Sequence, residues 1–281
     1  MDQIIRAPRG ESLSEDQLRH YVPALFAEEP HESRSDRYRF IPTIDVVKAL
    51  VAADFRPVEA RQSLSRDVGK RPYTKHMIRF RAGTPLAVGD SIYEVIMRNG
   101  HDGSACYEMT AGLLKLLCLN GMAVKSASLA DVKVRHSGNQ DLVIREVVDG
   151  ARAVLDYGPK VLETVKQWQT IELTPDEQGI YSVEAHKLRF ADHEGKLHTP
   201  IEPKQLLQAR RSADAGSDLY SVFNRVQENS IRGGLSALGR DKHGFARRST
   251  TKGIKGIDGD LKLNRALWSL TEKMAELKQA A

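Results

Sequence analysis

Apolar and polar residues alternate along three segments in the first half of the chain, and this pattern predicts β-strands. The predicted strands are Phe55–Leu64, Tyr73–Arg81 and Ser91–Arg98. Successive side chains of a strand point to opposite faces. His76, Ile78 and Phe80 therefore share one face of the second strand. The opposite face carries Lys75, Met77, Arg79 and Arg81.

The next run, Asn99–Gly121, reads NGHDGSACYEMTAGLLKLLCLNG and predicts a helix. Met109, Leu113 and Leu116 repeat at helical spacing. Asp102 or Ser104 can cap the N-terminus, and Gly121 can end the helix in a left-handed conformation. We therefore expect a buried helix over 104–119 that packs on a sheet.

Strands are also predicted within 122–130 and 131–137, and helices account for most of the remaining chain. The predicted helices are Gln140–Thr170, Thr174–Phe190, Lys204–Arg210, Ser217–Ile231 and Leu261–Gln279. Gly158-Pro159 should divide the first of these, because proline lacks a backbone donor. The expected fold class is α+β: a mostly antiparallel sheet with a central buried helix in β-β-β-α order, and a helical C-terminal half.

The expected organisation is a polar N-terminal arm (1–40), an α+β sheet core (41–138), a helical region packed on that core (139–231), a basic flexible segment (232–260) and a C-terminal helix (261–281). The 281 residues are 41% hydrophobic, which suffices for a sizeable core. No apolar run approaches the roughly 18 residues of a membrane span. The N-terminus has no apolar core of a secretory signal, and only Cys106 and Cys118 are cysteines, so a reducing cytoplasm is expected.

Positive charge is concentrated in one segment. The formal net charge is +5, and 232–255 carries seven basic residues against the single acid Asp241. The basic residues are Arg232, Arg240, Lys242, Arg247, Arg248, Lys252 and Lys255. Such a block often meets a polyanion, although a solvated loop has the same composition.

Four segments resemble a family carried by prophages and plasmids, known as domain of unknown function 932. They are YTKHMIRFR, the run Asn99–Gly121, LLQARRSAD (206–214) and DLYSVFNRVQENSIRGG (218–234). The resemblance spans about Pro42 to Leu277, with Tyr220 where many members are expected to have tryptophan. It implies a mobile-element context, and it transfers no catalytic residue.

A basic sheet face is the clearest candidate site. Its residues would be Arg61, Lys75, Arg79, Arg81, Lys133 and Arg135. Cations bind phosphates and nearby aromatic rings stack on bases, so this face suits a nucleic-acid backbone. Exposed strand faces are also rich in lysine and arginine for solubility alone. Arg240, Lys242, Arg247, Arg248, Lys252 and Lys255 would add a flexible clamp.

The strand, strand, strand, helix order is similar to the core of single-strand annealing proteins. Those proteins form rings or filaments, so the analogy predicts a homo-oligomer that binds single-stranded DNA in recombination or DNA maintenance. The alternative is an element-encoded interaction protein that inhibits a host defence or replication factor. No membrane partner is expected.

Catalysis is weakly indicated. His76, His101, Asp102 and His136 lack a metal-ligand spacing, and the two histidines on strands are better explained as hydrogen-bonded core residues. Cys106 could be a thiol nucleophile, but its apolar neighbours favour burial. The polar face of 217–231 could contact a nucleic acid, a subunit or solvent. The sequence therefore predicts no catalytic residue, metal or cofactor.

Overall fold

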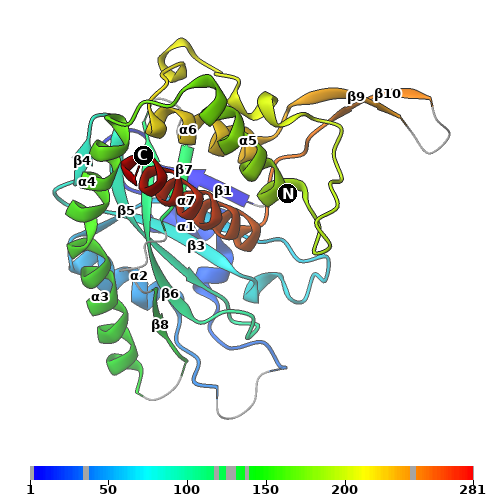
Figure 1. Ribbon diagram of the computed structural model, residues 1–281. Helices are drawn as coiled ribbons and strands as arrows, with labels where there is room; N and C mark the ends of the chain where they lie inside the picture. Colours follow the sequence, from blue (N-terminus) through cyan, green and yellow to red (C-terminus); the bar gives the residue numbers. More distant parts are fainter. Residues whose placement is uncertain are drawn as a thin grey trace. The chain divides into compact units, whose positions relative to one another are not determined.

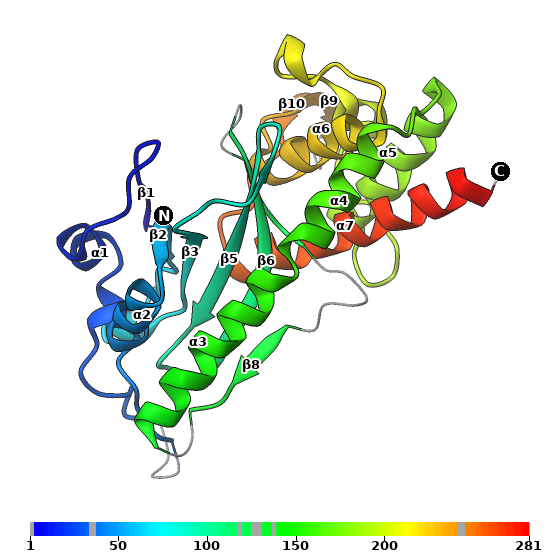
Figure 2. The same ribbon diagram turned by 90° about the vertical axis from the view of Figure 1, so that its left-hand side faces the viewer.

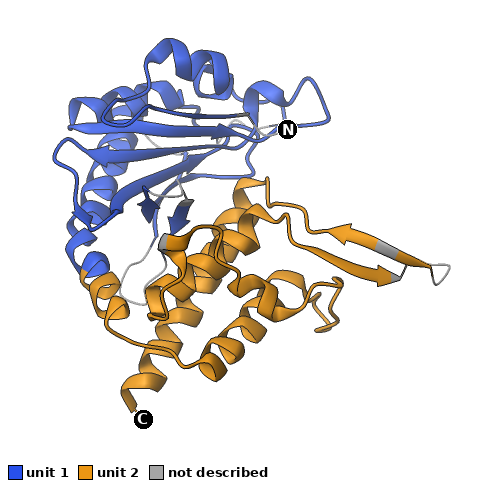
Figure 3. Cartoon of the chain, turned by 90° about the horizontal axis from the view of Figure 1, so that it is seen from above, with its two compact units in different colours: residues 1–162 blue, residues 163–281 orange. Residues whose placement is uncertain are grey.

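The computed structural model describes residues 3–33, 38–116, 120–124, 131–136, 139–240 and 245–280. The chain forms two compact units, unit 1 (residues 1–162) and unit 2 (residues 163–281), which Figure 3 shows in different colours. No helix among the described residues is both long and apolar enough to cross a bilayer.

An antiparallel sheet is the framework of unit 1 (Figure 1). Its strand order is β1-β2-β3-β5-β6-β7, with β4 paired to β5 and β8 paired to β6. The strands are β1 (Gln3–Arg6), β2 (Phe55–Gln62), β3 (His76–Ala82), β4 (Ala87–Val88), β5 (Ser91–Asn99), β6 (Tyr107–Lys115), β7 (Asn120–Ala123) and β8 (Val132–Val134). The predicted α+β class and antiparallel sheet are confirmed.

Helices cover one face of this sheet. They are α1 (Glu15–Tyr21), α2 (Thr43–Ala52) and α3 (Gln140–Asp156). Figure 2 shows α3 running along β5, β6 and β8. The approach of α3 to β8 is close, because a Cβ on Gly150 would lie 2.6 Å from Val132 Cγ1. Tyr93 on β5 fixes the same helix by donating a hydrogen bond of 2.6 Å to the carbonyl of Val154.

The predicted central helix over 104–119 is wrong: its middle is the strand β6, between β5 and β7. Every residue of β6 is buried, so both faces of this strand are covered. A strand buried on both faces shows no alternation, and a short apolar run then resembles a helix in sequence. Gly112 marks the crowding, since a Cβ there would lie 2.8 Å from Ile96 Cδ1.

The expected helix end at Asn120-Gly121 is instead the start of β7. The β-β-β-α order is therefore wrong as well, since β6, β7 and β8 separate the first long strands from α3. Cys118 lies outside the described residues.

The N-terminal segment forms part of unit 1. Strand β1 pairs with β2, placing Arg6 opposite Glu59. Leu18 on α1 and Leu25 in the 3₁₀ helix η1 (Pro23–Phe26) are buried in the core. These few apolar residues among charged ones are enough to attach the segment.

Unit 2 is mainly helical, which confirms the expected helical C-terminal half. Its helices are the end of α4 (Gly158–Gln169), then α5 (Pro175–Phe190), α6 (Leu219–Arg232) and α7 (Ile257–Ala280), with 3₁₀ helices η3 (Pro203–Leu207) and η4 (Ser212–Asp214). Trp168, Phe223 and Trp268 meet in its core, where the two indole centroids are 4.4 Å apart. The structure has a break between α3 and α4 at the predicted Gly158-Pro159.

The helix boundaries follow the local capping chemistry. Thr174 and Glu177 form the reciprocal cap that begins α5, as predicted. Helix α7 begins at Ile257 rather than Leu261, with Asp258 and Asp260 in its first turn. The glycine at 259 weakens the helical pattern there, which is why the sequence places the start later.

A two-stranded hairpin occupies the basic segment that the sequence predicts to be flexible. Strands β9 (Ser236–Arg240) and β10 (Ala246–Thr250) pair antiparallel. Figure 3 shows this hairpin projecting from the helices of unit 2. Few apolar residues are needed for such a ribbon, because its backbone groups pair with each other across the two strands.

Candidate functional site

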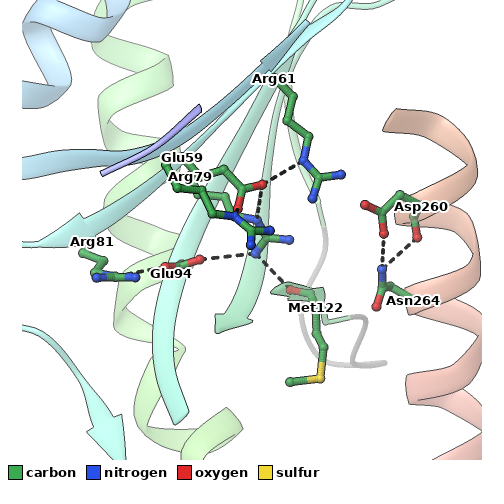
Figure 4. Close-up of polar contacts among 9 residues, drawn as sticks. Glu59, Arg61, Arg79, Arg81, Glu94, Met122, Asp260 and Asn264 are labelled. Carbon is green, nitrogen blue, oxygen red and sulfur yellow. Dashed lines mark hydrogen bonds and ion pairs between the residues drawn. The ribbon is translucent and has the colours of Figure 1, made fainter. Parts of the chain in front are cut away.

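The face of the unit 1 sheet opposite α2 and α3 carries a network of arginines and glutamates. Glu59 on β2 lies opposite Arg79 on β3 in the strand register. Figure 4 shows Arg79 and Arg81 on either side of Glu94, which comes from β5. The residues share this face because their positions alternate in phase with one another along neighbouring strands.

Short ion pairs connect the network. Arg6 and Arg61 donate from Nε to the two oxygens of Glu59, at 2.5 and 2.8 Å. Arg79 Nη1 and Arg81 Nε donate to Glu94, at 3.3 and 3.0 Å. Arg79 Nε lies 3.7 Å from Glu59 Oε1. One buried arginine therefore lies between two buried carboxylates.

Burial and the neighbouring arginines together shift the pKa values of both carboxyl groups. Burial alone would raise the pKa of Glu59, but Arg61, Arg79 and Arg6 outweigh this effect and lower it to about 2. Burial raises the pKa of Glu94 above its usual range, although Arg79 and Arg81 oppose the shift. The two acids are thus held in different electrostatic environments.

Glycines make room for the Arg79 guanidinium. A Cβ on Gly121 would lie 2.8 Å from Arg79 Cζ, and one on Gly112 would lie 3.0 Å from Nη1. Arg79 Nη1 also donates to the carbonyl oxygen of Met122 at 3.3 Å. Strands β6 and β7 therefore contact this arginine with their backbones.

The predicted basic sheet face needs correction at its centre. The Arg79 side chain is only 1% exposed, so it cannot reach a nucleic acid in this structure. Arg61 and Arg81 are 13% and 16% exposed and paired with glutamates. In the sequence alternation, Glu59 and Glu94 fall on the same strand faces as the arginines. This alternation is the sequence signal that could have predicted the ion pairs. The centre of this face is consequently a paired network and not a row of exposed cations.

The outer predicted residues are placed differently. Lys75 is half-buried just before β3. Lys133 on β8 and Arg135 after it are exposed. Lys133 lies opposite Glu108 in the register, and that glutamate accepts a hydrogen bond from Arg98. These three predicted residues are therefore not part of the Arg79 network.

The predicted clamp residues belong to the β9–β10 hairpin and the segment after it. Arg240 ends β9 and Arg247 is in β10, whereas Lys242 lies outside the described residues. Arg248, Lys252 and Lys255 are exposed. Two apolar hairpin residues, Leu238 and Phe245, are also 74% and 71% exposed.

The stem of this hairpin is a close crossing of two backbone segments. A Cβ on Gly233 would lie 2.6 Å from the carbonyl oxygen of Thr251, and one on Gly253 would lie 2.7 Å from that of Arg232. Arg189 donates to the carbonyls of Ser230 and Lys252, both at 2.9 Å, and so ties the two sides together. The structure therefore fixes how the hairpin leaves unit 2.

Three histidines cluster on the other face of the unit 1 sheet, beneath α2. The hydroxyl of Thr43 lies 3.0 Å from His76 Nε2 and 2.9 Å from His101 Nε2. His136 Nε2 lies 2.7 Å from Asn99 Oδ1, and the Asn99 amide donates to the same threonine at 3.0 Å. The prediction that His76 and His136 are hydrogen-bonded core residues is confirmed.

These contacts define which nitrogens carry hydrogen. His76 Nδ1 must donate to the carbonyl of Thr74 at 3.0 Å, so its Nε2 accepts the hydroxyl hydrogen of Thr43. His101 Nε2 then donates to Thr43, and His136 Nε2 donates to Asn99. All three rings are accommodated as neutral imidazoles, and burial lowers the pKa of His76 and His136 to about 4 and of His101 to about 2.

The remaining candidates for chemistry, Asp102 and Cys106, both precede β6. Asp102 accepts a hydrogen bond of 2.9 Å from the Ser104 backbone, so it shapes a turn. Cys106 is half-buried and directly precedes β6, so it does not lie at the helix N-terminus that the sequence predicts. Within the described ranges, no group of three His, Cys, Asp or Glu side chains is arranged to hold a metal ion.

The polar face of α6 is buried, contrary to both the binding and the solvated interpretations. Arg225 donates to the carbonyls of Asp214 and Gly216, and Asn229 donates to those of Leu206 and Gln208. Gln227 donates to a neighbouring amide, Asn264 Oδ1, at 2.6 Å. These amides and guanidinium groups hold η3, η4 and α7 against α6.

Comparison with known proteins places this architecture in a family. A family model described as a domain of unknown function, DUF932, matches residues 30–268. The UPF0380 protein YafZ of Escherichia coli (strain K12) is 40% identical over 266 residues, which is 95% of this chain and 93% of that protein. The UPF0380 protein YfjQ of the same strain is 39% identical over the same share of each chain. No solved structure matches. The chain therefore belongs to the DUF932 family.

Proposed function

We propose that this protein binds nucleic acid through the β9–β10 hairpin and the segment that follows it. One observation carries the proposal: a projecting ribbon whose described part includes Arg248 and leads to Lys252 and Lys255, all exposed. Asp241 is the only acid in the sequence of 232–255. Such a concentration of cations binds phosphates and releases the counterions that surround them.

Single-stranded DNA is the proposed ligand. Phe245 is 71% exposed beside the basic residues, and an exposed ring can stack on an unpaired base. Stacking tolerates any base, and phosphate contacts carry no sequence information. We therefore expect binding with little sequence preference.

The sheet of unit 1 contributes less to this proposal than the sequence suggested. Its central arginines are paired with Glu59 and Glu94, which leaves Lys133 and Arg135 as exposed cations of the predicted groove. The analogy with single-strand annealing proteins rested on a β-β-β-α order that the structure lacks. Annealing would still require two strands to be held together, and hence an oligomer.

The proposed setting is DNA maintenance of a mobile element in the cytoplasm, which follows from the family resemblance and the cysteine content. A second candidate function is inhibition of a host protein. Leu238 is 74% exposed, and exposed apolar side chains on a projecting ribbon also suit a protein partner. Charge separates the two, because a protein inhibitor does not require the lysines after the hairpin.

The test is a binding titration of the full chain with single- and double-stranded oligonucleotides at two salt concentrations. Neutralising Arg248, Lys252 and Lys255 to glutamine should flatten the log–log salt dependence by about 0.7 for each phosphate that the variant no longer neutralises. Phe245→Ala should weaken single-strand binding about tenfold, the lower range for removing a base stack. The matched control neutralises Lys166, Lys187 and Lys273, which are exposed on helices.

Absence of binding to either form at low salt would end the nucleic-acid proposal and favour the host-protein candidate. Equal weakening in the hairpin and control variants would show that general charge, and not the hairpin, accounts for binding. Light scattering with and without oligonucleotide addresses annealing, since a strictly monomeric protein would exclude it.

A further inference from the structure

A cavity of about 410 Å³ opens beside the arginine–glutamate network of unit 1. Three arginines line it: Arg6 from β1, Arg9 from the following turn and Arg81 from β3. Glu59 and Glu94 form part of its wall, together with apolar residues such as Leu114. This volume is typical of a site for a small organic ligand.

The guanidinium groups at this cavity retain donors. Arg6 and Arg81 use Nε to bind Glu59 and Glu94. Among the residues that the structure describes, no acceptor binds the Nη groups of Arg6 or Arg81, and none binds Arg9. Each guanidinium has five N–H donors in a fixed plane, so several remain for a ligand.

Cations outnumber anions at this site. Glu59 and Glu94 face four arginines of the network, Arg6, Arg61, Arg79 and Arg81, and Arg9 adds a fifth at the cavity. The carboxylates are already bound by arginines, and apolar walls weaken solvent screening. A ligand with several negative charges would offset the excess and would accept bidentate hydrogen bonds from guanidinium groups.

We propose that this cavity binds a phosphate-bearing ligand through Arg6, Arg9 and Arg81. The ligand is a free nucleotide or the phosphorylated end of a nucleic-acid strand, which share this chemistry. The cavity belongs to unit 1 and the β9–β10 hairpin to unit 2, and the proposal does not depend on the function of that hairpin.

Calorimetric titration of the full chain with inorganic triphosphate tests the site. We expect saturable binding that Arg9→Gln weakens at least tenfold. Arg9 is exposed and makes no polar contact among the described residues, so its substitution should leave the fold intact. Arg81→Gln should have an equal or larger effect. Arg56→Gln is the matched control, because Arg56 is an exposed arginine on the same sheet that does not line this cavity.

Failure to saturate, or equal weakening by Arg9→Gln and Arg56→Gln, would overturn the proposal. Two further ligand arms identify the source of the phosphate. A free nucleotide is the ligand if a nucleoside triphosphate binds more tightly than triphosphate. A strand end is the ligand if a 5′-phosphorylated oligonucleotide displaces triphosphate and its 5′-hydroxyl counterpart does not.

A protein with Arg248, Lys252 and Lys255 neutralised separates this inference from the proposed function. It should lose oligonucleotide binding through the hairpin and keep its triphosphate affinity within twofold. A parallel decrease in triphosphate binding would mean that the hairpin, and not the cavity, holds the phosphate, and would contradict the inference.

Discussion

Lowering the pH from 7.0 to 5.5 should destabilise unit 1 through its three buried histidines. Burial keeps the imidazoles of His76, His101 and His136 neutral, with pKa values of about 4, 2 and 4. In the unfolded chain the pKa of a histidine is about 6.5. Unfolding therefore takes up protons in this range, and stability falls as the pH drops below 6.5.

The magnitude follows from proton linkage. At pH 5.5, about nine-tenths of each unfolded imidazole is protonated, whereas the folded rings are almost entirely neutral. Each histidine then lowers the free energy of unfolding by about 1.3 kcal/mol relative to pH 7.0, and three lower it by about 4 kcal/mol. Glu59, whose pKa is lowered to about 2, loses its stabilisation only below about pH 4.5 and does not contribute here. Burial raises the pKa of Glu94, so that carboxyl group takes up a proton more readily in the folded protein and opposes the effect of the histidines.

Native-state hydrogen exchange can measure this effect in the right unit. Amide protons of β3, β5 and β6 report on unit 1, whereas both tryptophans, Trp168 and Trp268, report on unit 2. His136→Asn should remove about a third of the pH dependence. His193→Asn, which replaces a side chain that is 89% exposed, is the control and should leave the steep dependence in place.

An unchanged pH dependence in His136→Asn would refute the reasoning. It would mean that the folded cluster accepts protons as readily as the unfolded chain does.

Three substitutions test other parts of the structure by urea denaturation at pH 7. Glu59→Gln should lower the free energy of unfolding by about 3 kcal/mol, because it leaves buried arginines without their carboxylate. The control Glu163→Gln, at an exposed position, should change it by no more than about 0.5 kcal/mol, and similar values for both would contradict the network. Gly121→Ala should destabilise the protein by about 1–3 kcal/mol, because the added methyl group would collide with the Arg79 guanidinium. Gly179→Ala has open space in α5 and should stabilise the protein by about 0.5 kcal/mol. A neutral Gly121→Ala would disprove the close contact with Arg79. Thr43→Val should destabilise the protein by about 1–3 kcal/mol, because it leaves buried histidine and asparagine groups unpaired. This loss should exceed that of the exposed control Thr84→Val. Equal losses would show that the Thr43 hydroxyl does not bind both histidines and the asparagine.

Strands with one helix-covered face were predictable from the sequence. In β3, His76, Ile78 and Phe80 face the helices and Arg79 faces the other way, as the alternation indicates. The N-terminal cap of α5 and the break before α4 were also predictable, because they depend on residues that are close in sequence. Strand β6 was not readable, because burial on both faces removes the alternation that identifies a strand.

The candidate site was only partly predictable. The sequence assigns Arg61, Arg79 and Arg81 to one face, but whether these arginines form ion pairs depends on which acids lie across the strands. Glu59 and Glu94 are opposite or diagonal to these arginines only in the observed register. Pairing between strands that are distant in sequence is a tertiary property, so counting the basic residues of single strands overestimates the charge that a face presents.

The crossing of Gly233 and Gly253 suggests how this part of the chain can vary among relatives. Neither position has space for a Cβ, and the Arg189 hydrogen bonds close the stem, so substitutions there carry a packing cost. Beyond the stem, each residue of β9 pairs with one residue of β10. Deleting one residue from each strand therefore keeps the remaining residues in register. Insertions and deletions should therefore occur in matched pairs between residues 236 and 250, so that the length of the arm diverges while its point of attachment is retained.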